Sequence, residues 1–404
     1  MLTPINTLKN QRIVSIDAFR GITFFIMIIV NELAGVAGIS PWLKHMPANA
    51  DAMSFPDIVF PAFLFIVGMS IPFGINHRIA KGENRYSLNL HILQRAFALV
   101  VMGFFMVNAE GAYHQASMPL SIQTWSLLSY LGFMLIWGVY QFKQAYLNQA
   151  LVALGVLLLI FLAVIYRAGV DGAQGMTPQW WGILGLIGWA YLLSCWMYQL
   201  CRGKQILLFL ALVLCTLFYV FVHQPALAAA APTNGFLKFL VTLDGHAAHS
   251  AIVLGGLLCS LIFFEESKSR TQTQRFATAL AFALVLILAA SLLRPEFKIS
   301  KIYATPSWCF YSAAICIAVF ALLYWLIDLQ GIQSWMHAIK PAAINPLVCY
   351  LLPFVIEAML GLTKTPSPLR LAEGNVGILA ALFYAAGIML AVHGLNKINF
   401  KLKF

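Results

Sequence analysis

Long apolar runs separated by short polar loops dominate this 404-residue sequence. Each run is about 20 residues long, the length that an α-helix needs to cross the hydrocarbon core of a bilayer. Lipid offers no hydrogen-bonding partner to an exposed backbone, so runs of this length fold in a membrane as helices. The pattern predicts about 12 transmembrane helices. We expect them near residues 14–38, 57–76, 91–108, 121–141, 145–166, 180–201, 204–222, 246–264, 275–293, 304–328, 338–360 and 377–395.

Composition excludes a soluble domain. The chain is 61% hydrophobic and 10% charged, whereas soluble domains are about 25% charged. Its net charge of +11 comes mainly from short loops, which indicates contact with a lipid bilayer rather than with nucleic acid. The seven cysteines form no CxxC pair, so we expect neither a disulfide framework nor a metal site. The sequence predicts an all-α polytopic membrane protein, built as a single domain over residues 1–404.

The loops also predict the orientation. With the amino terminus in the cytoplasm, the inner loops hold roughly twice as many Lys and Arg residues as the outer loops, as the positive-inside rule requires. This count predicts N-in and C-in topology with an even number of spans.

Polar residues cluster around the first predicted hairpin. Asn31 and Glu32 lie near the outer end of the first span, His45 follows in the outer loop, and Asp57 opens the second span. Such groups are costly within a membrane, so each needs a partner or a function. His45 can act as a base or nucleophile that Asp57 orients. In the alternative interpretation, Asp57 only caps the second helix and His45 is a surface residue.

Other polar residues allow two interpretations each. Asp17 and Arg20 are spaced to form a structural ion pair, and Arg95 either snorkels to lipid headgroups or binds a phosphate. Asp244, His246 and His249 could suggest a metal site, but no third His or Cys lies nearby, which favours a helix cap with pore-lining histidines. Asn345-Pro346 breaks the eleventh span and Glu357 follows it, which indicates either packing around the proline or a binding cavity. Thr305-Pro306-Ser307 marks a helix start, where it can serve as a cap alone.

Several of these residues occur in motifs that resemble one known family. The motifs are residues 12–21 (RIVSIDAFRG), 30–31 (VN), 42–45 (WLKH) and 57–70 (DIVFPAFLFIVGMS). In this order they resemble the heparan-α-glucosaminide N-acetyltransferase family, whose bacterial members are called NagX-like. Agreement is dense over the first hairpin, residues 12–76, and patchy to about residue 360, with Lys301 among the later matches. Residues 46–50 (MPANA) depart from the family's SWNG, and the hairpin at 180–222 resembles an insertion.

The resemblance implies acetyl transfer across the membrane of a bacterial inner-membrane protein. Acetyl-CoA in the cytoplasm would supply the group to an amino sugar, such as glucosamine or a glucosamine-ended oligosaccharide, on the other side. The essential histidine of the family matches His45, and its neighbouring asparagine and aspartate match Asn31 and Asp57. Either His45 acts as the general base, with Asn31 stabilising the oxyanion, or His45 itself carries the acetyl group. The family is also compatible with a homodimer.

The remaining site residues follow from their positions. Basic side chains near the inner face are expected to bind the CoA phosphates, and polar groups elsewhere are expected to bind the acceptor. The first group is Arg20, Arg78, Arg85 and Arg95, and the second is Glu32, Asp244, Glu357 and Asn345. Two rival functions remain open. An amino-sugar transporter fits the span count, although no two-half repeat is visible, and a non-catalytic scaffold would bind no CoA.

Overall fold

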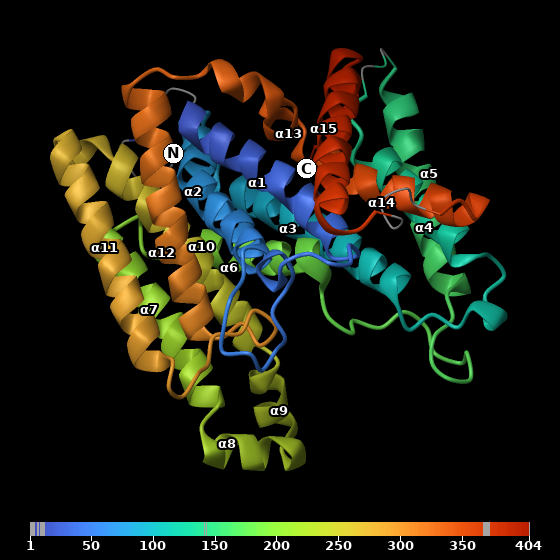
Figure 1. Cartoon of the computed structure of the whole chain (residues 1–404), viewed down its shortest axis with the longest axis horizontal. Helices are drawn as coiled ribbons and strands as arrows, with labels where there is room; N and C mark the ends of the chain where they lie inside the picture. The colour runs from blue at the N-terminus through green and yellow to red at the C-terminus, as the bar shows by residue number, and fades with distance from the viewer. Residues whose placement is uncertain are drawn as a thin grey trace. The chain divides into compact units, whose positions relative to one another are not determined.

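The computed structural model describes residues 5, 8, 13–140, 142, 144–366 and 372–403. Arg12, the first residue of the motif in the first hairpin, lies outside the described residues. The described part is helical, without a β-strand (Figure 1). The helices are α1 (Val14–Leu33), α2 (Val59–Ala80), α3 (Arg85–Glu110), α4 (Ile122–Trp137), α5 (Ala145–Ile165), α6 (Gly182–Leu200), α7 (Gln205–Val222), α8 (Pro225–Ala230), α9 (Gly235–Val241), α10 (Asp244–Phe264), α11 (Gln272–Leu293), α12 (Pro306–Leu323), α13 (Lys340–Ile344), α14 (Pro346–Thr363) and α15 (Gly374–Lys397).

The prediction of an all-α polytopic membrane protein is confirmed. Eleven helices of the described part are long and apolar enough to cross a membrane. The shorter apolar helix α4 lies where the fourth of the predicted spans was expected. The break predicted in the eleventh span is also present, because α13 ends at Ile344 and α14 begins at Pro346. Proline suits a first helical position, where its missing N–H is not needed.

The chain forms two compact units, which are described separately. Unit 1 comprises Met1–Thr23, Ser40–Ala96 and Leu186–Gln333, and unit 2 comprises Phe24–Ile39, Phe97–Gly185 and Ser334–Phe404. The boundaries fall within α1, α3 and α6, so each of these helices contributes residues to both units.

Helix α10 forms the core of unit 1 and packs against α2, α7, α11 and α12. Its apolar segment is entirely buried. Glycines allow α2 and α10 to approach very closely, because a Cβ at Gly68 would lie 1.9 Å from the carbonyl oxygen of Val253, and one at Gly256 would lie 1.9 Å from that of Phe65. Small residues that let two backbones touch are typical of helix packing in membranes.

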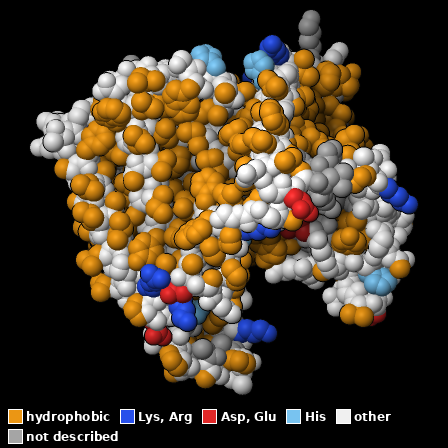
Figure 2. Space-filling view, viewed as in Figure 1, with side chains coloured by type: hydrophobic (Ala, Val, Ile, Leu, Met, Phe, Trp, Pro, Cys, Tyr) orange, Lys and Arg blue, Asp and Glu red, His pale blue; other side chains and the backbone are white. Residues whose placement is uncertain are grey.

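The outer helices of unit 1 present apolar side chains on their unpacked faces. Leu280, Leu284, Leu288 and Leu292 recur every four residues along α11, and all four are exposed. Figure 2 shows hydrophobic side chains spread over the face that α11 and α12 present. A continuous apolar surface of this kind fits contact with lipid.

Unit 2 is built around α4, which packs against α5 and α14. The indole nitrogen of Trp125 donates to the carbonyl of Leu162 at 2.9 Å, which ties α4 to α5. The side-chain amide of Asn345 donates to the carbonyl of Phe400 at 2.8 Å, which ties the α13–α14 break to the segment after α15. Each bond satisfies a polar group that would otherwise be buried without a partner.

Candidate functional site: a histidine, an aspartate and a lysine in unit 1

His45 and Asp57 form a hydrogen-bonded pair in unit 1. His45 lies in the loop of residues 40–55, hereafter the histidine loop, and Asp57 lies in the short 3₁₀ helix Pro56–Ile58 that precedes α2. The Nδ1 atom of His45 is 2.7 Å from Oδ1 of Asp57. The Asp57 side chain is 2% exposed and that of His45 is 39% exposed. The carboxylate is therefore buried, whereas the imidazole remains accessible to a ligand.

The second oxygen of Asp57 is fully engaged by the histidine loop. Oδ2 accepts hydrogen bonds from the backbone N–H groups of Met46 at 3.2 Å and Ser54 at 3.0 Å, and from the Ser54 hydroxyl at 2.8 Å. A buried carboxylate requires such partners. All of these donors precede Asp57 in the chain and none belongs to α2, so the side chain does not act as a plain helix cap.

This arrangement fixes the tautomer of His45. Asp57 is an ionised acceptor that has no proton to donate, so the Nδ1 atom of His45 must carry the hydrogen of the 2.7 Å contact. The lone pair of the neutral ring then lies on Nε2.

Lys301 completes the site, although it was not among the predicted site residues. Its Nζ atom is 3.2 Å from Nδ1 and 3.4 Å from Nε2 of His45. An atom at nearly equal distances from both nitrogens would overlap ring atoms if it lay in the ring plane, so Nζ lies over the face of the imidazole. The in-plane lone pair of Nε2 therefore remains directed away from the lysine. Burial lowers the pKa of the Lys301 ammonium, and the charge of Asp57 opposes this effect.

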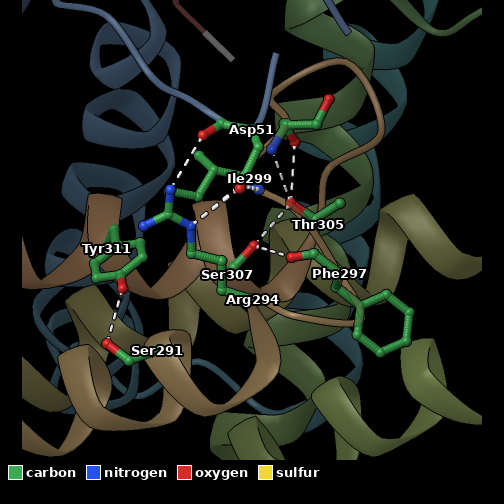
Figure 3. Close-up of polar contacts among 9 residues, drawn as sticks. Asp51, Ser291, Arg294, Phe297, Ile299, Thr305, Ser307 and Tyr311 are labelled. Carbon is green, nitrogen blue, oxygen red and sulfur yellow. Dashed lines mark hydrogen bonds and ion pairs between the residues drawn. The ribbon is translucent and has the colours of Figure 1, made fainter. Parts of the chain in front are cut away.

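The motif Thr305-Pro306-Ser307 shapes the loop that carries Lys301. This loop comprises residues 294–305 and is hereafter called the lysine loop. Within it, the Thr305 hydroxyl accepts a hydrogen bond from the backbone N–H of Ser300 at 3.0 Å, and the Thr305 N–H donates to the Ser300 carbonyl at 3.1 Å. The Ser307 hydroxyl donates to the Phe297 carbonyl (Figure 3). The motif is therefore more than the helix cap considered from sequence, because it closes a tight turn with Lys301 inside it.

Asp51 joins the histidine loop to the lysine loop. Its carboxylate accepts from Nε of Arg294 at 3.1 Å and from the backbone N–H of Ile299 at 2.9 Å (Figure 3). The hydrogen bond from Ile299, and after it the one from Arg294, hold the pKa of Asp51 below its usual value; the Ile299 bond has the larger effect. A second link runs from the Tyr303 hydroxyl to the side chain of Asn49 at 3.3 Å. Two loops far apart in sequence are thus held together beside His45.

The four arginines predicted to bind CoA differ in their partners. Arg20 pairs with Asp17 at 3.0 Å, as the sequence predicted, and also donates to Ser70. Arg78 pairs with Glu83 at 2.7 Å. Arg85 is exposed at the start of α3.

Arg95 is half-buried, with its guanidinium carbon 4.9 Å from the centre of the Tyr191 ring. Its Nε atom has no hydrogen-bond partner among the described residues. Arg95 is therefore more available to bind an anion than Arg20 or Arg78, because each of those already has a carboxylate partner.

Two predicted acceptor residues and Asn31 lie in unit 2. Asn31 is exposed near the end of α1, and Glu32 is the next residue. Glu357 lies on α14, within electrostatic range of Glu110 at the end of α3. The Tyr384 hydroxyl is within electrostatic range of both Glu32 and Glu357. Glu110 is an acidic neighbour that the sequence did not single out. The roles given to Asn31, Glu32 and Glu357 stay predictions.

The other two predicted acceptor residues already have structural partners. Asn345 uses its amide group on the Phe400 carbonyl and lies close to the Leu402 N–H, both near the carboxyl terminus. Asp244, at the start of α10, is 3.5 Å from Nε2 of His223 at the end of α7. His249, one turn further along α10, is buried against Phe60 and Trp308. Within the described residues, no three His, Cys, Asp or Glu side chains are grouped so as to hold a metal ion.

Comparison with known proteins agrees with the motifs. Residues 12–177 match the family model described as Domain of unknown function (DUF5009). The chain is 34% identical over 97 residues to the heparan-alpha-glucosaminide N-acetyltransferase of Homo sapiens, and 32% identical over 98 residues to that of Mus musculus. The resemblance to heparan-α-glucosaminide N-acetyltransferases is confirmed. It covers 24% of this chain and 14% of the length of each relative, so the N-acetyltransferase activity of those enzymes is not thereby established for the whole chain.

Proposed function

We propose that this protein transfers an acetyl group from acetyl-CoA to the amine of an amino sugar, with His45 as the reacting base or nucleophile. The observation that carries the proposal is the 2.7 Å contact between Nδ1 of His45 and the buried carboxylate of Asp57. This contact leaves Nε2 as the nitrogen that can act as base or nucleophile, on a side chain that is 39% exposed. N-acetyltransferase is also the activity named for both mammalian relatives.

The chemistry needs little beyond this pair, because a thioester is already a reactive acyl donor. In the direct route, the sugar amine attacks the thioester carbonyl, the C–N bond forms as the C–S bond breaks, and Nε2 of His45 takes the proton from the amine. In the two-step route, Nε2 attacks first and releases the CoA thiolate, and the amine then displaces the acetyl group from His45. Asp57 stabilises the positive charge that develops on the imidazole in either route.

Acetyl-CoA is proposed to approach from the cytoplasmic side, where Arg95 supports binding of a phosphate. An arginine forms strong, charge-assisted hydrogen bonds with phosphate oxygens. Replacement of Arg95 by glutamine should therefore raise the KM for acetyl-CoA and leave the KM for the sugar unchanged. Arg85 remains a second proposed contact, because its side chain is exposed at the start of α3.

The acceptor is proposed to be a glucosamine-type sugar on the opposite, periplasmic side of a bacterial inner membrane. The histidine loop lies on that side if the amino terminus is cytoplasmic, as the charge bias predicts. Carboxylates such as Glu32 and Glu357 suit an ammonium group or sugar hydroxyls, and they are proposed to contribute to acceptor binding.

The test uses the full-length protein in liposomes with acetyl-CoA carrying a labelled acetyl group. Acetylated product is measured for glucosamine, a glucosamine-ended oligosaccharide and N-acetylglucosamine, the last as an acceptor without a free amine. We expect labelled product with the first two, and its loss in His45→Ala. If His45→Ala instead keeps normal acetyl transfer, or the wild type only accumulates unmodified sugar inside the liposomes, the enzyme proposal fails and a transporter is favoured. Labelled protein formed without acceptor would select the two-step route.

A further inference from the structure

We propose that Lys301 is a catalytic residue whose ammonium group stabilises the oxyanion that forms during acetyl transfer. This inference rests on the proposed function and extends it to a residue that no comparison assigns. It starts from the position of Nζ over the face of the His45 ring, 3.2 Å from Nδ1 and 3.4 Å from Nε2.

The position of Lys301 suits the geometry of carbonyl attack. A nucleophile approaches a carbonyl carbon at a steep angle to the C=O bond, so the oxygen points sideways from the line of attack. If the carbonyl carbon lies near Nε2, the oxygen can turn toward the face of the imidazole. Nζ occupies one of these faces, which places a positive charge beside the developing oxyanion.

The same charge also acts on His45. A cation over the ring attracts the neutral, electron-rich imidazole and repels the imidazolium. Asp57 acts in the opposite direction, because its carboxylate favours the protonated ring. Asp57 therefore stabilises the charge that develops on the ring during the reaction, while Lys301 stabilises the oxyanion.

The step balances without a further reactant. As the nucleophile forms its bond to the carbonyl carbon, the π electron pair of the C=O bond moves onto oxygen beside Nζ. The pair returns as the C–S bond breaks and CoA leaves as a thiolate, which takes up a proton from the protonated His45 or from water. Lys301 keeps its own protons throughout. Because both routes pass through this oxyanion, the role of Lys301 does not depend on which one operates.

The surrounding structure is built to hold Lys301 in place. The turn closed by Thr305 and Ser300 limits movement of the lysine loop. Asp51 ties that loop to the histidine loop through Arg294 and Ile299 (Figure 3). Preorganised groups of this kind stabilise a transition state without needing to reorganise during the reaction. Asp51 thus acts as a positioning residue for Lys301.

The experiment compares Lys301→Met, Lys301→Arg and the matched control Lys298→Met, which removes the same charge from an exposed position in the same loop. Loss of one oxyanion-stabilising group lowers kcat by about 10²- to 10³-fold. We expect that loss in Lys301→Met with little change in the KM for acetyl-CoA. Lys301→Arg should recover at least about a tenth of the wild-type kcat, because it keeps the charge, and Lys298→Met should behave as the wild type.

Several results would overturn the proposal. These are a near-normal kcat in Lys301→Met, an equal loss in Lys298→Met, or a Lys301→Arg variant no more active than Lys301→Met. If Lys301→Met does not fold, Lys301→Gln takes its place. The positioning role of Asp51 is tested by the kcat of a folded Asp51→Asn variant, and an unchanged kcat would count against that role. Wild type and His45→Ala are assayed alongside. If the wild type transfers no acetyl group, the proposed function fails; if only His45→Ala loses transfer, the inference about Lys301 alone fails.

Discussion

Replacing Asp57 by asparagine would change one atom of the site and reverse the tautomer of His45. The new side chain would still have to accept the two N–H groups and the hydroxyl that now meet Oδ2, so its amide oxygen should take the Oδ2 position. Its NH₂ group would then face Nδ1 of His45 at the place where the 2.7 Å contact now lies. An NH₂ group can only donate, so Nδ1 would become the acceptor and Nε2 would carry the hydrogen.

The expected loss follows from this reversal. With Nε2 protonated, His45 can neither accept a proton nor attack a carbonyl through that atom. Positioned general bases contribute about 10²- to 10⁴-fold to rate, so kcat should fall by that factor. Folding should change little, because asparagine has the same shape and keeps all three acceptor contacts at the Oδ2 position.

The assay measures kcat together with the thermal unfolding of purified protein in detergent. Asp57→Ala is the contrasting variant, since it leaves the two buried donors of Ser54 and the part-buried N–H of Met46 without an acceptor, at about 1–3 kcal/mol for each buried unsatisfied group. It should lose both activity and stability, whereas Asp57→Asn should lose activity alone. An Asp57→Asn variant that keeps more than about a tenth of the wild-type kcat would refute the assignment of the tautomer and with it the role of the pair.

Two further predictions concern stability and pH. Gly68→Ala would place a Cβ 1.9 Å from a carbonyl oxygen of α10, so it should destabilise the protein by about 1–3 kcal/mol or more. In thermal unfolding, its matched control Gly74→Ala, on the same helix with open space around it, should behave as the wild type. The hydrogen bonds from Ile299 and Arg294 lower the pKa of Asp51 from 3.8, so the link between the loops should be complete above that pH and be lost as pH falls through the lowered value. Pepsin cleavage within residues 45–51, normalised to an unfolded peptide, should therefore stay constant down to pH 3.8 and rise only below it in the wild type; a similar rise in Asp51→Asn would contradict this assignment.

The sequence predicted the features that depend on neighbouring residues. Helix positions follow from local hydropathy, which is why the predicted spans coincide closely with long helices. His45 and Asp57 are only 12 residues apart in the sequence, so their pairing could be anticipated from chemistry and spacing. The ion pair of Asp17 with Arg20 is likewise local, one turn along a single helix.

The features that the sequence left open depend on contacts across the chain. Lys301 lies 256 residues from His45, and Arg294 lies 243 residues from Asp51. Neither pairing has a periodic signal, and a loop lysine is usually an exposed charge. The signals available were the match of Lys301 to the family and the motif around Thr305, but the purpose of that motif, a turn that holds Lys301, becomes visible only once the loop is folded.

The contact between His45 and Lys301 also bears on the number of spans. Both side chains must lie on the same side of the membrane, so the chain between them has to cross it an even number of times. The long helices between the two loops are α2, α3, α5, α6, α7, the segment containing α10, and α11, which is an odd number. The shorter helix α4 supplies the missing crossing. With α4 counted as a crossing, the described helices give twelve spans, and we expect both termini on one side, as the loop charges independently predict.

The packed core of unit 1 holds the residues of the site in place. The indole N–H of Trp308, which is fully buried on α12, donates to the backbone carbonyl of Asp57 at 3.1 Å. The same helix begins directly after the lysine loop, so α12 fixes both Asp57 and Lys301. Helix α10 packs against both α2 and α12, and its close approach to α2 depends on Gly68 and Gly256. The relative positions of histidine, aspartate and lysine are therefore a consequence of helix packing within the apolar core, and a change there should alter the proposed acetyl transfer.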